Sequence, residues 1–255
     1  MPTSYAVVNQ KGGVGKTTTT VNLAAYFATF GKKILLIDVD PQSNASIGLG
    51  MERNDTNYCL YDVLINGMSL DEVKQPSSIA GLDLIPASPK LAGAEVELVE
   101  MANREYLLKN ALALVKDQYD YILIDCPPSL SLLTVNALTA ANEVIIPIQC
   151  EYYALEGISQ LTHTLELVRS TLNPDLKIRG IILTMFDPRT LLSSQVAEET
   201  RKYFGSKVFK TVVPRNIRLA EAPSFGQPIV FYDPGSKGAV AYENLCREVL
   251  ENELS

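Results

Sequence analysis

A glycine-rich stretch between an apolar run and a helical pattern constrains this chain most. Residues 9–18 read N-Q-K-G-G-V-G-K-T-T, residues 5–8 before them suit a strand, and residues 19–30 after them suit a helix. Strand, glycine loop and helix is the context that a phosphate-binding loop requires. Glycines let the backbone approach a ligand closely, and a helix N-terminus favours an anion. The stretch therefore predicts a site for the phosphates of a nucleotide.

Two side chains of this loop have a defined use in such a site. Lys16 supplies a cation for the β- and γ-phosphates, and the hydroxyl of Thr17 is placed to ligate Mg²⁺. The usual loop reads G-x-x-x-x-G-K-[ST], whereas this one has Gln10 at the first glycine and a second lysine, Lys11. An incidental glycine-rich turn would not place strand, loop and helix in register. The predicted nucleotide-binding residues are Lys11, Gly12, Gly13, Val14, Gly15, Lys16, Thr17 and Thr18.

Two later apolar runs end in carboxylates. Residues 33–37 lead into Asp38 and Asp40, and residues 121–124 lead into Asp125, which two prolines follow. Ligands of open α/β sheets bind at the carboxyl ends of the strands. Asp125 matches a Walker B acid, which holds Mg²⁺ through water. Carboxylates buried beside a triphosphate are costly unless a cation offsets them, so Thr17, Asp38 and Asp125 are the predicted metal residues.

Alternation of strand and helix patterns sets the fold class. Apolar runs at residues 81–86, 143–149, 178–186 and 208–213 extend the strand series, and helical patterns separate them. Residues 91–117 predict one long helix or two, joined near Asn103, and residues 237–253 predict a final helix. We therefore expect one α/β domain over residues 1–255. It would be a doubly wound, mostly parallel sheet of seven or eight strands, flanked by helices.

Cysteine spacing and hydropathy exclude several classes. The four cysteines form no C-x-x-C pair, which argues against a zinc site or a disulfide framework. No apolar run approaches the roughly 18–20 residues of a membrane span, so we expect a cytoplasmic protein without a membrane partner.

Charge is distributed unevenly along the chain. The net charge is −7, but residues 177–218 carry nine Lys/Arg against three acids. This segment suggests one surface for a polyanion on an otherwise acidic body, with a solvated charged face as the plainer alternative.

Together these motifs resemble the ParA/MinD family of P-loop ATPases with a deviant Walker A loop, and most closely its chromosomal ParA/Soj branch. The matching segments, in order, are K-G-G-V-G-K-T-T-T, D-V-D-P-Q, D-C-P-P-S, Q-C-E-Y-Y-A-L-E-G, V-P-R-N and E-A-P-S-F-G. The resemblance implies that Lys11 reaches the phosphates bound by a partner subunit, and that Asp40 orients the attacking water. With Lys16, these are the predicted catalytic residues. It also implies that Asp38 lies near the Mg²⁺ shell.

The resemblance implies further contacts outside the phosphate loop. Pro214, Arg215 and Asn216 match the segment that lies against adenine, and Glu151 matches an acid at the dimer interface near the ribose. Arg189 and Arg218 match the family's DNA-contacting arginines. Lys177, Arg179, Lys202, Lys207 and Lys210 are weaker candidates for DNA contact.

The function implied is ATP-dependent DNA partitioning. ATP and Mg²⁺ are the expected cofactors. A homodimer formed with ATP would bind double-stranded DNA without sequence specificity, and a ParB/Spo0J-type protein would stimulate hydrolysis and release. We expect the protein to be associated with the nucleoid.

Other branches of the family fit less well. A MinD-like membrane-cycling ATPase would end in a basic amphipathic helix, whereas the last predicted helix is acidic. A nitrogenase-type reductase would need a second cysteine suited to an interfacial cluster beside Cys126. A tyrosine kinase of this family would need a C-terminal tyrosine cluster, but only Tyr242 is present there.

Overall fold

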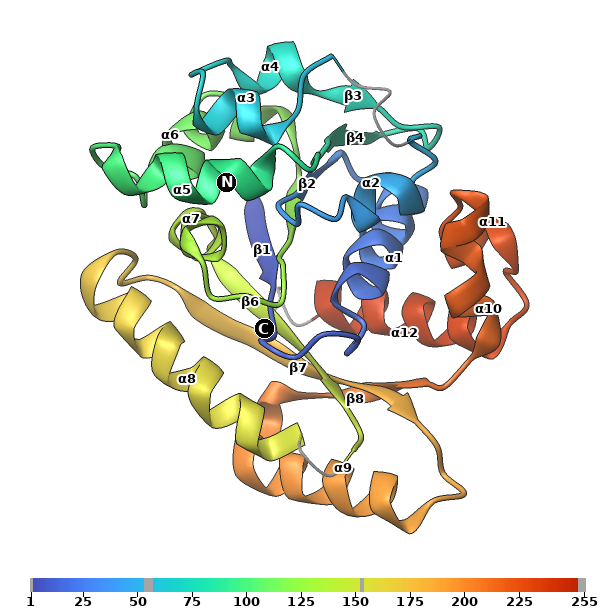
Figure 1. Ribbon diagram of the computed structural model, residues 1–255. Helices are drawn as coiled ribbons and strands as arrows, with labels where there is room; N and C mark the ends of the chain where they lie inside the picture. The colour runs from blue at the N-terminus through green and yellow to red at the C-terminus, as the bar shows by residue number, and fades with distance from the viewer. Residues whose placement is uncertain (1, 53–56, 152–153, 252–255) are drawn as a thin grey trace.

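An eight-stranded sheet forms the centre of the computed structural model, which describes residues 2–52, 57–151 and 154–251 (Figure 1). The strand order is β3-β4-β2-β5-β1-β6-β7-β8, and every pair is parallel except β3 with β4. The prediction of a mostly parallel sheet of seven or eight strands is confirmed. The strands are β1 Thr3–Val7, β2 Ile34–Asp38, β3 Gln75–Pro76, β4 Leu82–Ile85, β5 Tyr121–Asp125, β6 Glu143–Gln149, β7 Lys177–Phe186 and β8 Val208–Pro214.

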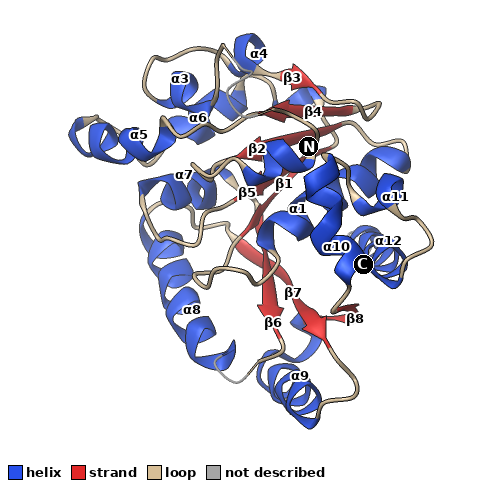
Figure 2. Ribbon diagram, turned by 45° about the vertical axis from the view of Figure 1, so that its right-hand side comes forward, coloured by secondary structure: helices blue, strands red, loops and turns tan. Residues whose placement is uncertain are grey.

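Helices cover both faces of this sheet, as Figure 2 shows. α1, α10, α11 and α12 lie on one side, and α5, α6, α7 and α8 lie on the other. The α-helices are α1 Lys16–Thr29, α2 Asn44–Gly48, α3 Leu60–Leu64, α4 Leu70–Val73, α5 Leu91–Glu97, α6 Leu107–Ala113, α7 Leu132–Ala140, α8 Ala154–Thr171, α9 Leu191–Phe204, α10 Ile217–Glu221, α11 Ile229–Tyr232 and α12 Lys237–Glu251.

The central strands are buried on both faces, which explains their unbroken apolar sequences. In β1, Tyr5 and Val7 pack into the core on the α1 side, and Ala6 packs into the core on the opposite side. β2 and β5 alternate in the same way. Successive side chains of a strand point to opposite faces, so a sheet covered by two helical layers needs apolar residues at every position.

Local backbone geometry corrects one expected helix boundary and confirms another. α1 begins at Lys16, three residues earlier than predicted, because Gly15 adopts φ 92° and ends the loop there. The pattern over 91–117 divides into α5 and α6, with Asn103 between them at φ 53°.

The C-terminal helix α12 uses its apolar side within the core. The Tyr242 hydroxyl lies 3.1 Å from that of Thr19, and the Tyr26 hydroxyl donates to the Ala239 carbonyl at 2.8 Å. Leu245 and Val249 are also buried. This helix therefore packs against α1 instead of presenting an apolar face to its surroundings. Across the described residues, no helix combines the length and hydropathy needed to cross a membrane.

A contact between two glycines joins the α2 region to the 3-10 helix η4, Ala222–Phe225. Gly50 and Gly226 both have positive φ, of 90° and 62°. A Cβ atom added to Gly226 would lie 2.6 Å from the Gly50 Cα, closer than non-bonded carbons approach. Glycine is therefore required at this contact by both space and backbone conformation.

We predict that Gly226→Ala lowers the free energy of unfolding by about 1–3 kcal/mol, because the backbones must separate. Gly235→Ala is the matched control, since its Cβ would meet only a side-chain oxygen at 3.9 Å. Urea denaturation of both variants measures the difference. Equal stability of the two variants would show that the Gly50–Gly226 contact is not tight in solution.

Candidate nucleotide-binding site

The loop between β1 and α1 has the backbone of an anion site. Gly13 and Gly15 adopt φ of 74° and 92°, which other residues rarely do. No side chain caps the N-terminus of α1, so the N–H groups of its first turn are not claimed by a cap. These donors and the helix dipole favour a phosphate at the start of α1.

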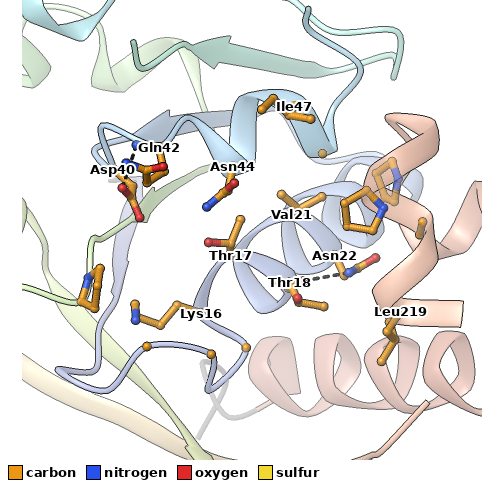
Figure 3. A pocket seen from close by; sticks show the side chains of 18 of the residues that line it. Lys16, Thr17, Thr18, Val21, Asn22, Asp40, Gln42, Asn44, Ile47 and Leu219 are labelled. Atoms are coloured by element: carbon orange, nitrogen blue, oxygen red, sulfur yellow. Dashed lines mark hydrogen bonds between the residues drawn. The ribbon is translucent and has the colours of Figure 1, made fainter. Parts of the chain in front are cut away.

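A cavity of about 470 Å³ opens above this loop (Figure 3). Its phosphate end is formed by the loop, the start of α1 and the β2–α2 connection, as the labelled side chains of Lys16, Thr17 and Asp40 show. Its other end is apolar. The lining residues are Gly12, Gly13, Gly15, Lys16, Thr17, Thr18, Val21, Asn22, Asp40, Gln42, Asn44, Ile47, Gly48, Pro128, Met185, Leu219, Ala222, Pro223, Gln227 and Pro228.

Lys16 is a buried cation at the phosphate end. The residue is only 7% exposed, and its ammonium donates to the Lys11 carbonyl at 3.1 Å. Burial lowers the pKa of Lys16, and the negative charges of Asp125 and Asp40 partly oppose this effect. A phosphate bound here would restore the charged form of the lysine, so the site is electrostatically suited to an anion.

Asp125 ties the sheet to the phosphate loop. Its carboxylate accepts hydrogen bonds from the hydroxyls of Thr17 and Thr20, both at 2.8 Å. It is fully buried, and burial raises its pKa above the ordinary value despite these hydrogen bonds. The hydroxyl and carboxylate predicted to bind metal are thus brought together by the fold.

Asp38 lies beneath the cavity and does not line it. One carboxylate oxygen accepts from the backbone N–H and the hydroxyl of Ser46, at 2.8 and 2.7 Å, and the other accepts from the Asp40 backbone at 3.2 Å. Burial, followed by the nearby charge of Asp125, raises the pKa of Asp38. Asp38 therefore holds α2 and the backbone of Asp40, and its predicted place near a Mg²⁺ shell stays a prediction.

The residues at the phosphate end fit a magnesium–nucleotide complex. Asp38 and Asp125 are both buried with raised pKa values, so a cation beside them would lower the cost of their ionisation. In the part of the chain that the structure describes, no group of three or more His, Cys, Asp or Glu could hold a metal alone. Mg²⁺ accepts such a site, because it is commonly held by one or two protein groups together with substrate phosphates.

Two members of the predicted loop set lie off the cavity wall. Val14 is buried, and its carbonyl accepts from the Thr184 hydroxyl at 2.8 Å. Lys11 has a side chain that is 41% exposed, and its ammonium lies 3.6 Å from a Glu151 carboxylate oxygen. Lys11 therefore faces outward while Lys16, from the same loop, faces inward. The neighbouring Tyr152 and Tyr153 lie outside the described residues.

The expected adenine segment is displaced from the cavity. Among the described residues, Pro214, Arg215 and Asn216 do not contribute to its lining, and the Asn216 side chain instead caps α10 by accepting from the Arg218 N–H at 2.8 Å. Nucleotide contact by this segment stays a prediction. The cavity wall away from the phosphate end includes residues that were not predicted from the sequence, namely Met185, Leu219, Ala222, Pro223, Gln227 and Pro228, and all of these except Gln227 are apolar. Ala222 and Pro223 belong to the E-A-P-S-F-G motif, and Gln227 and Pro228 follow it directly, whereas Met185 and Leu219 lie outside it.

The basic segment does not form one surface. Arg189 and Arg218 follow the carboxyl ends of β7 and β8, near the phosphate loop, whereas Lys177 and Lys207 adjoin the amino ends of the same strands. Arg179 is only 10% exposed and pairs with Glu143. The segment therefore divides between two edges of the sheet.

Each of the two predicted DNA-contacting arginines is paired with acids. Arg189 is 86% exposed and pairs with Asp187 at 2.7 Å, which holds the Asp187 pKa down at about 2. Arg218 is 50% exposed and pairs with Glu221 at 2.9 Å and Asp233 at 3.3 Å. Solvent screens exposed ion pairs of this kind and leaves them little stabilising effect, so phosphates can compete for the two arginines.

Comparison with known proteins defines the family. A family model described as an AAA domain matches residues 3–178. The sporulation initiation inhibitor protein Soj of Bacillus subtilis is 58% identical over 247 residues, which cover 97% of this chain and 98% of Soj. The chromosome partitioning protein ParA of Myxococcus xanthus is 54% identical over 97% of this chain and 87% of its own. The chain belongs to the ParA/Soj family of chromosome-partitioning ATPases.

Solved structures of similar proteins agree with this membership. Cobyrinic acid a,c-diamide synthase of Mycobacterium smegmatis, with ADP and magnesium, is 36% identical with a TM-score of 0.88, covering 100% of this chain and 96% of its own. MinD of Pyrococcus horikoshii, with Mg-ADP, is 28% identical with a TM-score of 0.83, covering 99% and 98%. The predicted P-loop ATPase fold and family are confirmed, and these bound nucleotides support ATP and Mg²⁺ as cofactors of this ParA/Soj protein.

We predict that the nucleotide-free protein loses stability as the pH rises. A raised pKa means that the folded state favours the protonated carboxyl. The stabilisation is therefore complete below the ordinary Asp value of 3.8 and is lost as pH rises through the raised values of Asp38 and Asp125. Each unit of raised pKa corresponds to about 1.4 kcal/mol.

Urea denaturation of the wild type and Asp38→Asn between about pH 5 and 8 measures this effect. The variant should show a flatter dependence on pH, because it lacks one titrating group. Asp120 is an exposed acid at the opposite end of β5, so Asp120→Asn is the control. Its free energy of unfolding should depend on pH in the same way as that of the wild type. Parallel curves for Asp38→Asn and the wild type would contradict the prediction.

Proposed function

We propose that this protein is an ATP-driven DNA-partitioning ATPase whose nucleotide state controls dimerisation and thereby DNA binding. One observation carries the proposal: the side chains of the two lysines in the phosphate loop point in different directions. Lys16 lines the cavity, whereas Lys11 lies off the cavity wall and is 41% exposed. An inward lysine serves the subunit's own phosphates, and an outward lysine is available to a second copy.

Hydrolysis in this proposal depends on positioning and charge. Among the described residues that line the cavity, none is a histidine, and the one carboxylate is Asp40, whose Oδ1 accepts from the Gln42 N–H at 2.9 Å. Asp40 would orient the attacking water. Lys16, together with the signature lysine Lys11 of a second copy, would stabilise charge on the phosphates. Thr17 and Asp125 would hold Mg²⁺, which neutralises charge on the phosphates when bound.

DNA binding in this proposal uses paired patches on two copies. Arg189 and Arg218 both follow strand ends on the same edge of the sheet as the nucleotide cavity. Affinity for duplex DNA rises steeply with the number of phosphates neutralised, so a dimer that aligns two such patches binds far more tightly than one subunit. ATP would switch DNA affinity through dimerisation, and hydrolysis would reset it.

The remaining parts of the proposal follow from this cycle. A ParB/Spo0J-type protein would stimulate hydrolysis, and DNA-bound dimers would accumulate on the nucleoid.

A MinD-like membrane cycle is the second candidate function. The burial of Tyr242, Leu245 and Val249 of α12 weighs against it, because these apolar side chains pack in the core and are not available to a bilayer.

We predict that Asp40→Ala leaves a DNA-bound dimer that hydrolyses ATP at least about 100-fold more slowly, because the water loses its orienting acid. Steady-state phosphate release measures turnover, and light scattering with ATP measures dimerisation. Asp71→Ala, an exposed acid of α4, is the control and should behave as the wild type. Rapid turnover by Asp40→Ala would remove Asp40 from this role.

We predict that Arg218→Ala weakens ATP-dependent binding to non-specific duplex DNA and lowers the slope of log affinity against log salt. Loss of one phosphate contact changes this slope by about 0.9, and a dimer loses two contacts. Arg247→Ala is the control, because Arg247 is similarly exposed and paired but lies on α12. An unchanged salt slope with Arg218→Ala would place the DNA surface elsewhere.

A further inference from the structure

Glu151 gathers three side chains from three separate elements. Its Oε2 lies 3.6 Å from the ammonium of Lys11, in the phosphate loop. Its Oε1 lies 3.5 Å from the guanidinium of Arg215, which follows β8, and accepts from the Gln149 amide at 2.5 Å. One carboxylate thus connects the segments that follow β1, β6 and β8, at the edge of the sheet where the phosphate loop lies.

The backbone beside Lys11 is fixed, so its side chain is the part that can move. The buried side chain of Asn9 donates to the Pro147 carbonyl of β6 at 2.7 Å and accepts from the Lys11 N–H at 3.0 Å. Asn9 therefore holds the loop and the end of β6 together, and with them Lys11 and Glu151. Rotation of the lysine side chain can break the ion pair without moving either strand.

We propose that Glu151 is a positioning residue that holds the signature lysine Lys11 within its own subunit and releases it when two subunits join. The inference rests on the proposed function, in which Lys11 serves the phosphates of the partner. A movement of the Lys11 ammonium from Glu151 to a phosphate on another subunit breaks this ion pair. Dimerisation must therefore compete with this internal ion pair, which favours the separate subunits.

Arg215, the second cation beside Glu151, lowers the free-energy cost of releasing Lys11. When Lys11 leaves, Glu151 keeps Arg215 and Gln149 on Oε1, and Oε2 becomes available to water. The side chains of Lys11, Glu151 and Arg215 are 41%, 45% and 62% exposed, so the carboxylate is never left unpaired in a dry site. A weak and partly hydrated ion pair suits a reversible step better than a buried one.

Zero-length carbodiimide cross-linking tests the pairing directly, because it joins only amines and carboxylates in contact. We expect a Lys11–Glu151 cross-link within one chain in nucleotide-free protein, identified by mass spectrometry. The yield should fall several-fold in Asp40→Ala with ATP, where the dimer persists. An equal yield in both states would overturn the inference. If ATP produces no dimer at all, the proposed function fails, and the inference fails with it.

Glu151→Gln tests the energetic consequence. It should lower the protein concentration needed for ATP-dependent dimerisation, on the order of fivefold, since the competing ion pair is lost in both subunits. Glu243→Gln, which removes a similarly exposed acid paired with Arg247, is the control and should not change it. The direction of the change in dimerisation distinguishes two roles for Glu151. If Glu151 instead acts as an interface contact near the ribose, Glu151→Gln weakens dimerisation, and the inference is wrong.

Discussion

The site depends on one buried carboxylate at the end of β5. Asp125 accepts from Thr17 and Thr20 on α1, and this pair of hydrogen bonds fixes the first turn of the helix against the sheet. The phosphate loop, the inward lysine and the cavity are positioned by that attachment. Asp125 and Asp38 are buried near each other with raised pKa values, so their ionisation has an electrostatic cost that a bound cation and nucleotide can relieve. Ligand binding and local stability are therefore linked at this point.

Features that short sequence patterns encode were predictable from the sequence. Strand, glycine loop and helix identified the phosphate site, and apolar runs ending in acids identified β2 and β5. These features are short, and their chemistry restricts the residue types that can serve.

Features that depend on tertiary contacts were not predictable. The apolar wall around Leu219 and Pro223 is set by a glycine contact between Gly50 and Gly226, 176 positions apart in numbering, and by a bond from the Ile229 N–H to the Asn22 side chain at 2.7 Å. The basic segment read as one surface because its residues are close in sequence. In a strand–helix–strand unit, however, residues before a strand and residues after it lie at opposite ends of the sheet. Lys177 and Lys207 lie at the amino ends of β7 and β8, whereas Arg189 and Arg218 follow their carboxyl ends.

The central claim is that nucleotide state controls DNA binding through the association of two subunits. The most direct test is binding of the wild-type protein to non-specific duplex DNA with ATP, with ADP and with no nucleotide, each at low and moderate salt. The account predicts binding with ATP alone, which weakens steeply as salt rises. Binding that is equal in all three nucleotide states, or absent from all three, would contradict it.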